Sequence, residues 1–390
     1  MLKRYKLRDY NFILVLMLIT LSGIGVLLVG SADPSLQRKQ FIGMIAGVIL
    51  MLIVSLMDYS WLLNFYWLIY AADLILLIAV ILRGESSKGA SRWIRIGSFQ
   101  FQPTEICKIL LIMFFAMYLM KHEEDLNTFR TIAKAVVLIA VPLVLVFKQP
   151  DLKNTITIAV IFCILIYIAG LSYKIIGGTI LIVVPLIAVL LLLITQTDLP
   201  IINEYQKDRI MAKMFSEDDA YSEDLIQQDN SITAIGSGQL TGKGLNNNKV
   251  SSANKGNFVA ESQNDFIFAV AGEELGFIGS GAIVLLLFGI IAECIRIGKR
   301  AKDIAGTLIC CGVAATVAIQ SFINIAVATG LIPNTGTPLP FVSYGLTSLW
   351  SLYIGMGLAL NVGLQNKKYF GGNLELSLIH ISEPTRRRGI

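Results

Sequence analysis

The chain has 390 residues, of which 55% are hydrophobic and only 15% are charged, with a formal net charge of +5. Soluble proteins carry closer to a quarter of charged residues, so this composition excludes an ordinary soluble protein. Its two histidines, His122 and His380, lie in polar or terminal stretches, which argues against histidine-based nucleophilic or zinc chemistry, and the modest positive charge predicts no nucleic-acid partner.

Ten apolar segments along the chain are predicted to cross a membrane. A spanning helix needs roughly 20 predominantly apolar residues, and we expect the shorter segments to extend into their polar flanks. The first segment is too long for a signal peptide and lacks a clear cleavage site, so we predict that it is retained. In chain order the segments are Phe12–Val29, Phe41–Met57, Leu62–Leu82, Glu105–Leu119, Ala135–Phe147, Thr155–Ala169, Ile175–Ile194, Phe266–Ile291, Ile304–Ala328 and Leu346–Val362. The predicted fold class is an all-α polytopic membrane protein.

Lysine and arginine residues predict how these helices are oriented. They are more frequent in the loops on the side of the N-terminus than in the short loops of the opposite side, and cytoplasmic loops carry such an excess. We therefore predict that both termini are cytoplasmic. The loop Arg83–Phe101, on the predicted outer side, is itself basic, which suits an anionic client there.

Ionisable side chains inside predicted spans are costly and are therefore candidates for function. Glu105 and Lys108 are three residues apart, so they share a helical face and can pair. Such a pair either orients two helices or takes part in chemistry, and both interpretations stay open. Asp151 follows Gln149 and Pro150 at an outer helix end, where a cap or turn residue is the simpler interpretation.

A long outer loop, about residues 195–264, is far longer than an ordinary helix connection. It contains a glycine-rich stretch, AIGSGQLTGKG (Ala234–Gly244). Its glycines and Lys243 could hold a diphosphate through backbone amides and one cation. A plain tight loop is the simpler interpretation, because the stretch does not match a phosphate-binding loop motif.

Asp265 lies where this loop ends and an apolar helix begins. Aspartate caps helices well, and from the local sequence alone a cap is the favoured interpretation. Alternatively, a carboxylate at the lipid surface is partly desolvated, which raises its pKa toward the working range of a general base. Glu261, close by, could assist or repel it.

A second outer loop, NTGTPLPFVSYG (Asn334–Gly345), contains two prolines in three residues. The prolines fix a stiff, extended backbone, so the loop is either a rigid connector or lines a binding groove. Its Ser343 is a candidate substrate-binding or supporting residue.

Five motifs in order resemble the landmarks of the SEDS family, the RodA/FtsW-like peptidoglycan glycosyltransferases. They cover nearly the whole chain to about Gln365. The motifs are KGASRWIRIGSFQFQPTEICKI (Lys88–Ile109), QPDL (Gln149–Leu152), AIGSGQLTGKGL (Ala234–Leu245), NDFIFAVAGEELGF (Asn264–Phe277) and NTGTPLPFVSYG (Asn334–Gly345).

The resemblance implies a ten-span enzyme of the bacterial cytoplasmic membrane. SEDS proteins polymerise lipid II into glycan strands on its outer face, for cell elongation or division, beside a class B penicillin-binding protein that cross-links the strands. The essential acid of the family falls on Asp265, which favours catalysis over capping there. Other positions of the family motifs fall on Glu105, Lys108, Asp151, Arg92 and Trp93.

The implied chemistry needs one base and a means of stabilising a departing diphosphate. The donor sugar is α-linked to undecaprenyl diphosphate and the product is β-1,4-linked, so a single inversion with Asp265 as base suffices. Outer cations such as Arg92, Lys243 or Arg209 are expected to hold diphosphates. Mg²⁺ or Mn²⁺ stays open as a cofactor with unknown ligands, and no organic cofactor is expected.

The sequence departs from the family pattern at several positions. Asn264 stands where threonine is usual, Leu346 replaces a glycine after SYG, and QPDLGT is replaced by QPDLKN, with Lys153 and Asn154. GEELGF leans toward FtsW, but the motifs do not separate an elongation role from a division role.

Two other classes of function compete with this interpretation. One is a flippase or transporter of lipid-linked precursors, since the segment Ile175–Ile194 contains glycines and a proline, as broken transport helices do. The other is a non-catalytic scaffold for a transpeptidase. We assign residues 1–370 to one membrane domain, and we interpret the tail 371–390, which ends LSLIHISEPTRRRGI, as partly non-native sequence.

Overall fold

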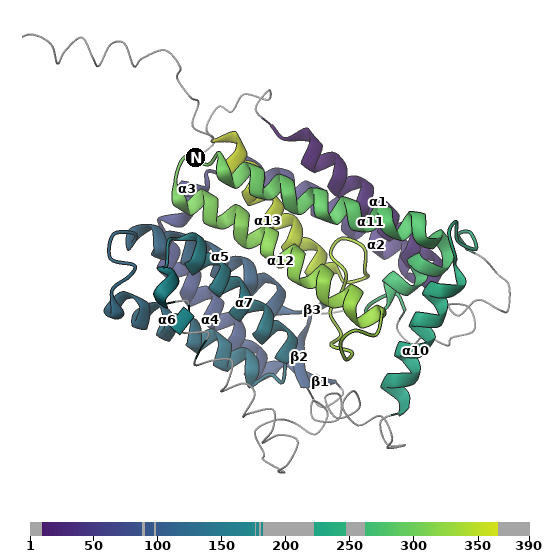
Figure 1. The fold of residues 1–390 in the computed structure, drawn as a ribbon. Helices are drawn as coiled ribbons and strands as arrows, with labels where there is room; N and C mark the ends of the chain where they lie inside the picture. Colours follow the sequence, from purple (N-terminus) through teal and green to yellow (C-terminus); the bar gives the residue numbers. More distant parts are fainter. Residues whose placement is uncertain are drawn as a thin grey trace, which may run out of the picture.

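The computed structural model describes residues 10–87, 90–96, 99–175, 177, 178, 181, 222–246 and 262–365. These residues form a bundle of long helices with one small antiparallel sheet (Figure 1). The helices are α1 (Phe12–Ala32), α2 (Pro34–Leu56), α3 (Tyr59–Leu63), α4 (Tyr66–Arg83), α5 (Pro103–Lys121), α6 (Phe129–Phe147), α7 (Leu152–Ile168), α10 (Ser222–Ser237), α11 (Ile267–Lys299), α12 (Ile304–Ala328) and α13 (Leu346–Leu364).

The predicted all-α membrane fold is confirmed. Seven of the described helices, α1, α2, α5, α6, α11, α12 and α13, are long and apolar enough to cross a membrane, and α4 and α7 are shorter apolar helices. These nine helices correspond to nine of the ten predicted spans. The tenth, Ile175–Ile194, lies almost entirely outside the described residues.

Local sequence explains where several helices begin. Asp33 accepts a hydrogen bond from the backbone amide of Ser35, and Pro34 occupies the first turn of α2. Asp303 caps α12 in the same way, through the amide of Gly306. A short acid before the helix satisfies amides that have no partner within it, so the chain can turn sharply between adjacent spans.

Burial separates inner helices from outer ones. In α5 and α13, 83% of the spanning window is buried inside the protein, against 28% in α2, α6 and α11. The outer helices present large apolar side chains such as Leu16, Leu68 and Phe288 to the outside. Hydrocarbon is a suitable solvent for such a surface, and the inner helices α5 and α13 can then carry the buried polar groups.

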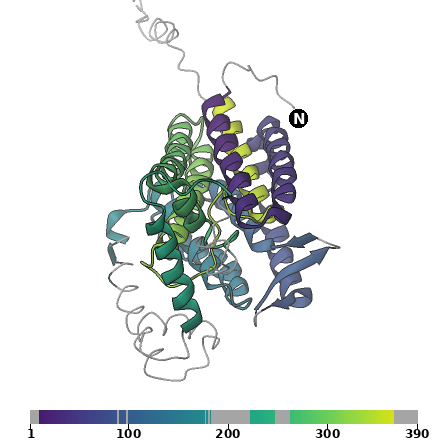
Figure 2. The same cartoon turned by 90° about the vertical axis from the view of Figure 1, so that its right-hand side faces the viewer.

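The two ends of the bundle differ. The start of α1 and the end of α13 lie together at one end, whereas the sheet and α10 lie at the opposite end (Figures 1 and 2). The loop between α12 and α13 is also at the end of the sheet and α10 (Figure 1). The sequence predicts that both termini are cytoplasmic, and on that prediction the second end faces outward; we call it the outer end.

The loop Arg83–Phe101 contains strands that the sequence analysis did not predict. They are β1 (Glu85–Ser87), β2 (Ala90–Ile96) and β3 (Phe99–Phe101), paired antiparallel in the order β1-β2-β3. Trp93 pairs with Glu85, and Ile94 pairs with Phe101. The alternation of polar and apolar residues in β2 suits a strand with two different faces.

The long outer loop has structure of its own where it is described. Helix α10 packs against α11, and the glycine-rich residues follow it. Helix α11 contains a kink at Gly276, where φ is +66°. Glycine adopts this conformation without steric cost, so the helix changes direction there.

Candidate active site

Asp265 lies half-buried in the turn before α11. The N-cap of α11 is Phe266, and no side chain caps this helix. The interpretation of Asp265 as a helix cap is therefore wrong. Asp265 instead lies one position before the N-cap, at the outer end of the bundle.

Asn324 of α12 fixes the backbone around Asp265. Its side-chain amide donates hydrogen bonds of 2.8 Å to the carbonyl oxygens of Asp265 and Thr337. The Asn324 side chain is fully buried. One side chain thus joins the turn that carries Asp265 to the loop Asn334–Gly345.

The same loop is attached to this turn at a second point. Ser343 Oγ donates to the carbonyl of Asn264 at 2.6 Å and accepts from the amide of Leu339 at 2.7 Å. The amide of Tyr344 donates to the carbonyl of Gln263 at 2.9 Å. Ser343 is buried within these contacts, so the structure gives it a positioning role for the turn.

Gly336 lies beside both Asp265 and a lysine of α7. A methyl carbon built on Gly336 would lie 3.2 Å from Asp265 Oδ2 and 3.7 Å from Lys153 Nζ. The carboxylate oxygen of Asp265 and the ammonium nitrogen of Lys153 are therefore at most 6.9 Å apart, the sum of these two distances. The Lys153 ammonium donates to the carbonyl of Gly336. Because Gly336 has φ +69°, a side chain there would be strained as well as crowded.

A buried polar network joins the outer ends of α5 and α7. Lys108 Nζ lies 2.9 Å from Glu105 Oε1 and 3.2 Å from Asn154 Oδ1. Asn154 Nδ2 donates to Asp151 Oδ2 at 2.8 Å, and Gln102 Nε2 donates to the same oxygen at 3.4 Å. The predicted pairing of Glu105 with Lys108 is confirmed.

The predicted cap at Asp151 is also confirmed. Its side chain is the N-cap of α7 and accepts from the amide of Asn154. Asp151 is fully buried, and its second oxygen belongs to the polar network. Lys153, two residues further along, instead contacts Gly336, so the start of α7 connects the polar network to the surroundings of Asp265.

Arg92 and Trp93 lie half-buried on β2. The Arg92 guanidinium donates to the carbonyl oxygen of Pro150, directly before Asp151. The sheet is thereby attached to the start of α7 at the outer end of the bundle.

Lys243 is bound to α11. Its ammonium lies 2.8 Å from Glu273 Oε1, and Glu273 is buried. The amides of Lys243 and Gly244 donate to the carbonyls of Glu273 and Glu274, each at 2.9 Å. The glycine-rich stretch thus pairs with the backbone at the kink of α11. Two other candidates, Arg209 and Glu261, lie outside the described residues.

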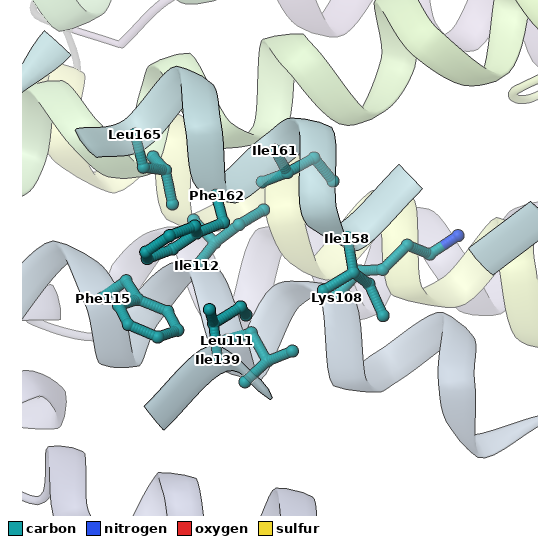
Figure 3. A pocket seen from close by; sticks show the side chains of 9 residues that line it. All are labelled: Lys108, Leu111, Ile112, Phe115, Ile139, Ile158, Ile161, Phe162 and Leu165. Carbon is teal, nitrogen blue, oxygen red and sulfur yellow. The ribbon is translucent and has the colours of Figure 1, made fainter. Parts of the chain in front are cut away.

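A narrow apolar cavity lies between α5, α6 and α7 (Figure 3). Its lining is aliphatic and aromatic apart from Lys108, whose ammonium points away from the apolar side chains (Figure 3). The polar network therefore adjoins an apolar space inside the membrane-spanning part.

Comparison with known proteins agrees with this arrangement. The family model of FtsW, RodA and SpoVE, described as "Cell cycle protein", matches residues 6–368. The chain belongs to this family. It is 32% identical over 383 residues to a probable peptidoglycan glycosyltransferase FtsW of Geobacter metallireducens. The alignment covers 93% of this chain and 96% of that relative.

Other relatives of this family have a different name. The peptidoglycan glycosyltransferase MrdB of Escherichia coli K12 is 32% identical over 361 residues, covering 91% of this chain and 93% of the relative. A chain solved in a study of a peptidoglycan synthase complex has a TM-score of 0.72 at 25% identity, covering 91% of this chain and 97% of that one. The rod shape determining protein RodA of Thermus thermophilus has a TM-score of 0.67 at 24% identity, covering 92% and 98%, and thus shares the fold.

Sequence reasoning missed three residues around Asp265, namely Asn324, Gly336 and Lys153. Asn324 is a polar residue inside an apolar helix, which was an available signal. Lys153 was noted only as a departure from the family motif. Contacts between such distant parts of the chain have no local signal in a single sequence.

Proposed function

We propose that this chain is a peptidoglycan glycosyltransferase that polymerises lipid II into glycan strands, with Asp265 as its general base. Family membership supports the class of reaction. The single structural observation that carries the assignment of the base is the position of Asp265. Asp265 lies half-buried at the outer end of the bundle, directly before the N-cap of α11, while Asn324 and the loop Asn334–Gly345 fix its backbone.

The proposed reaction is a single displacement with inversion. The 4-hydroxyl of the acceptor sugar attacks the anomeric carbon of a donor that is α-linked to undecaprenyl diphosphate. Asp265 takes the hydroxyl proton as the new β-1,4 bond forms, and the bond between the anomeric carbon and the diphosphate oxygen breaks. No water nucleophile is involved, so one carboxylate is sufficient.

Rigid support of Asp265 suits this role. A general base acts from within about 3 Å of the proton that it removes, and small displacements of the reacting groups lower the rate strongly. The bonds from Asn324 and Ser343 hold the backbone on both sides of the catalytic turn. We infer that they set the direction of the Asp265 side chain.

The surroundings of Asp265 suit an anionic substrate. Basic side chains at the outer end, such as Arg92 and Lys153, would attract the diphosphate. Among the described residues, no three His, Cys, Asp or Glu side chains are grouped as ligands for Mg²⁺ or Mn²⁺. We therefore derive no step through a metal.

The position of the buried ion pair favours an enzyme over a transporter. Glu105 and Lys108 lie in the first two turns of α5, close to the sheet, whereas a transporter concentrates such groups near the membrane midplane. We further propose that the protein lies in the bacterial cytoplasmic membrane with both termini inside. Its proposed partner is a class B penicillin-binding protein, as the similarity to a chain of a peptidoglycan synthase complex suggests.

The test is a reaction of the purified full chain with lipid II, with and without a partner transpeptidase whose own active site is inactivated. We expect glycan strands on a gel, and we expect a muramidase that cleaves β-1,4 bonds to digest them. Intact lipid II after incubation with a verified, folded protein would contradict the proposed function, and strands resistant to the muramidase would contradict the inversion.

A further inference from the structure

Lys153 is the charged residue of α7 that reaches the surroundings of Asp265. It occupies the first turn of the helix and is half-buried. Its ammonium donates to the carbonyl of Gly336 and lies on the same side of that residue as the carboxylate of Asp265, the side to which a Cβ atom would point. No step of the reaction proposed above uses this cation.

Three other cations near the outer end already have partners. Lys108 is buried and paired with Glu105, and Lys243 is paired with Glu273. The Arg92 guanidinium donates to the carbonyl of Pro150. Within the described part of the chain, Lys153 forms no ion pair, and its one hydrogen bond is to Gly336. An ammonium has three donors, so two stay available for a further anion.

We propose that Lys153 binds an oxygen of the departing diphosphate during glycosyl transfer. This inference rests on the proposed function, because the diphosphate belongs to that reaction. In an inverting displacement, the base and the leaving group lie on opposite sides of the reacting carbon. A cation that assists departure must therefore reach the side of the reacting carbon opposite the base, with the reacting carbon and its two oxygens between them.

The geometry of Lys153 meets this requirement. The ammonium and the carboxylate lie on the same side of Gly336, at most 6.9 Å apart, and a side chain on Gly336 would stand against both of them. As the donor bond breaks, negative charge grows on the diphosphate oxygen, and Lys153 stabilises that charge. The proton of the acceptor hydroxyl goes to Asp265, so the two residues act on opposite ends of the same displacement.

The experiment compares Lys153→Gln, Lys153→Arg and the control Lys148→Gln in the full chain. Glutamine keeps a donor for the Gly336 carbonyl but removes the charge, arginine keeps the charge, and Lys148 is exposed at the end of α6. Two quantities are measured, the rate of lipid II polymerisation and the binding of undecaprenyl diphosphate in detergent. Melting temperatures verify that each variant is folded.

We expect Lys153→Gln to polymerise about 10- to 100-fold more slowly and to bind undecaprenyl diphosphate about 10-fold more weakly. Lys153→Arg should stay within about 5-fold of the wild type in both measurements, and Lys148→Gln should be unchanged. Loss of binding with glutamine and its retention with arginine would support the charge of Lys153 as the cause.

Unaltered binding of undecaprenyl diphosphate by Lys153→Gln would overturn the inference, even if its polymerisation slowed, because Lys153 would then act only through the backbone at Gly336. Equal loss of binding by Lys153→Arg would also overturn it. The binding measurement needs no turnover. An inactive wild type would therefore count against the proposed function, whereas unaltered binding by Lys153→Gln would count against this inference.

Discussion

Asn324 connects three parts of the chain that are distant in sequence, namely α12, the turn before α11 and the loop Asn334–Gly345. Asn324→Ala removes both hydrogen bonds of its amide and leaves two carbonyl groups to find other partners. We expect a polymerisation rate about 10-fold below that of the wild type and a loss of stability of about 1–3 kcal/mol. Glycan strands quantified on gels and a thermal melt measure the two effects.

Thr329→Ala is the matched control for Asn324→Ala. Thr329 is exposed at the end of α12 and bonds only to carbonyls of its own helix, so its replacement should change neither quantity. A wild-type rate for Asn324→Ala would show that the backbone bond to Asp265 has no part in positioning the base.

Lys243 and Glu273 form the second residue-scale test, because the sequence suggested a substrate-binding role for Lys243. Lys243→Met removes the ammonium beside a buried carboxylate, which should cost on the order of 2 kcal/mol of stability. Adding Glu273→Gln removes the charge as well and should restore much of that stability. Melting temperatures and polymerisation rates of the two single variants and the double variant measure the coupling.

A structural role for Lys243 predicts that activity follows stability through this series. A double variant that melts like the wild type but makes no glycan strands would instead support a direct role in substrate binding.

Sequence predicted the residue-scale features that are local along the chain. The spacing of Glu105 and Lys108 implied their pairing, and the position of Asp151 before a helix implied its cap. Contacts of Lys153 with Gly336 and of Asn324 with Asp265 depend on how helices pack, which no local pattern reports. The local sequence favoured Asp265 as a cap, whereas the N-cap of α11 is Phe266, and the catalytic role that the family motif implies for Asp265 stays a prediction.

At the scale of elements, Gly276 determines the direction of α11. The amide of Phe277 donates to the carbonyl of Gln239, and a methyl carbon on Gly276 would lie only 2.3 Å from the amide nitrogen of Gly242. The backbone of α11 at the kink and the backbone of the glycine-rich stretch are therefore packed directly against each other. In the sequence a plain tight loop was the simpler interpretation of this stretch and a diphosphate-binding loop the alternative, and the described part serves as a backbone partner of α11.

Gly276→Ala should therefore be strongly destabilising. The substitution adds strain at φ +66° and a clash with backbone, so we expect a loss of more than about 2 kcal/mol, with reduced activity. Gly281→Ala is the matched control in the same helix, where an added methyl meets nothing within 4 Å and alanine favours helix. A thermal melt in which both variants behave alike would contradict the account of the kink.

The spans were predictable because apolar runs of sufficient length leave few alternatives in a membrane. The sheet β1-β2-β3 and helix α10 were not predicted. Both are short, amphipathic and outside the spans, where hydropathy says little. Both lie at the end of the bundle where α11 begins, so this end was less predictable from sequence than the spans.

In the whole molecule, the apolar outer surface is separate from the polar groups. The described helices expose apolar side chains outward, whereas polar groups collect on the inner helices and at the outer end.

The family match ends at residue 368, and the sequence from about Leu376 departs from the rest. We expect a variant that ends at Lys368 to polymerise lipid II at the wild-type rate. A loss of activity in a folded, membrane-inserted variant would show that the tail takes part.

The most direct test of the account is the rate of lipid II polymerisation by Asp265→Asn. Its control is Asp229→Asn, on an exposed part of α10 at the same end of the molecule. A general base contributes about 100- to 10,000-fold to a rate. We therefore expect Asp265→Asn to melt like the wild type but to polymerise at least about 100-fold more slowly, while Asp229→Asn is unaffected. An Asp265→Asn protein that polymerises lipid II within a few-fold of the wild type would contradict Asp265 as the base.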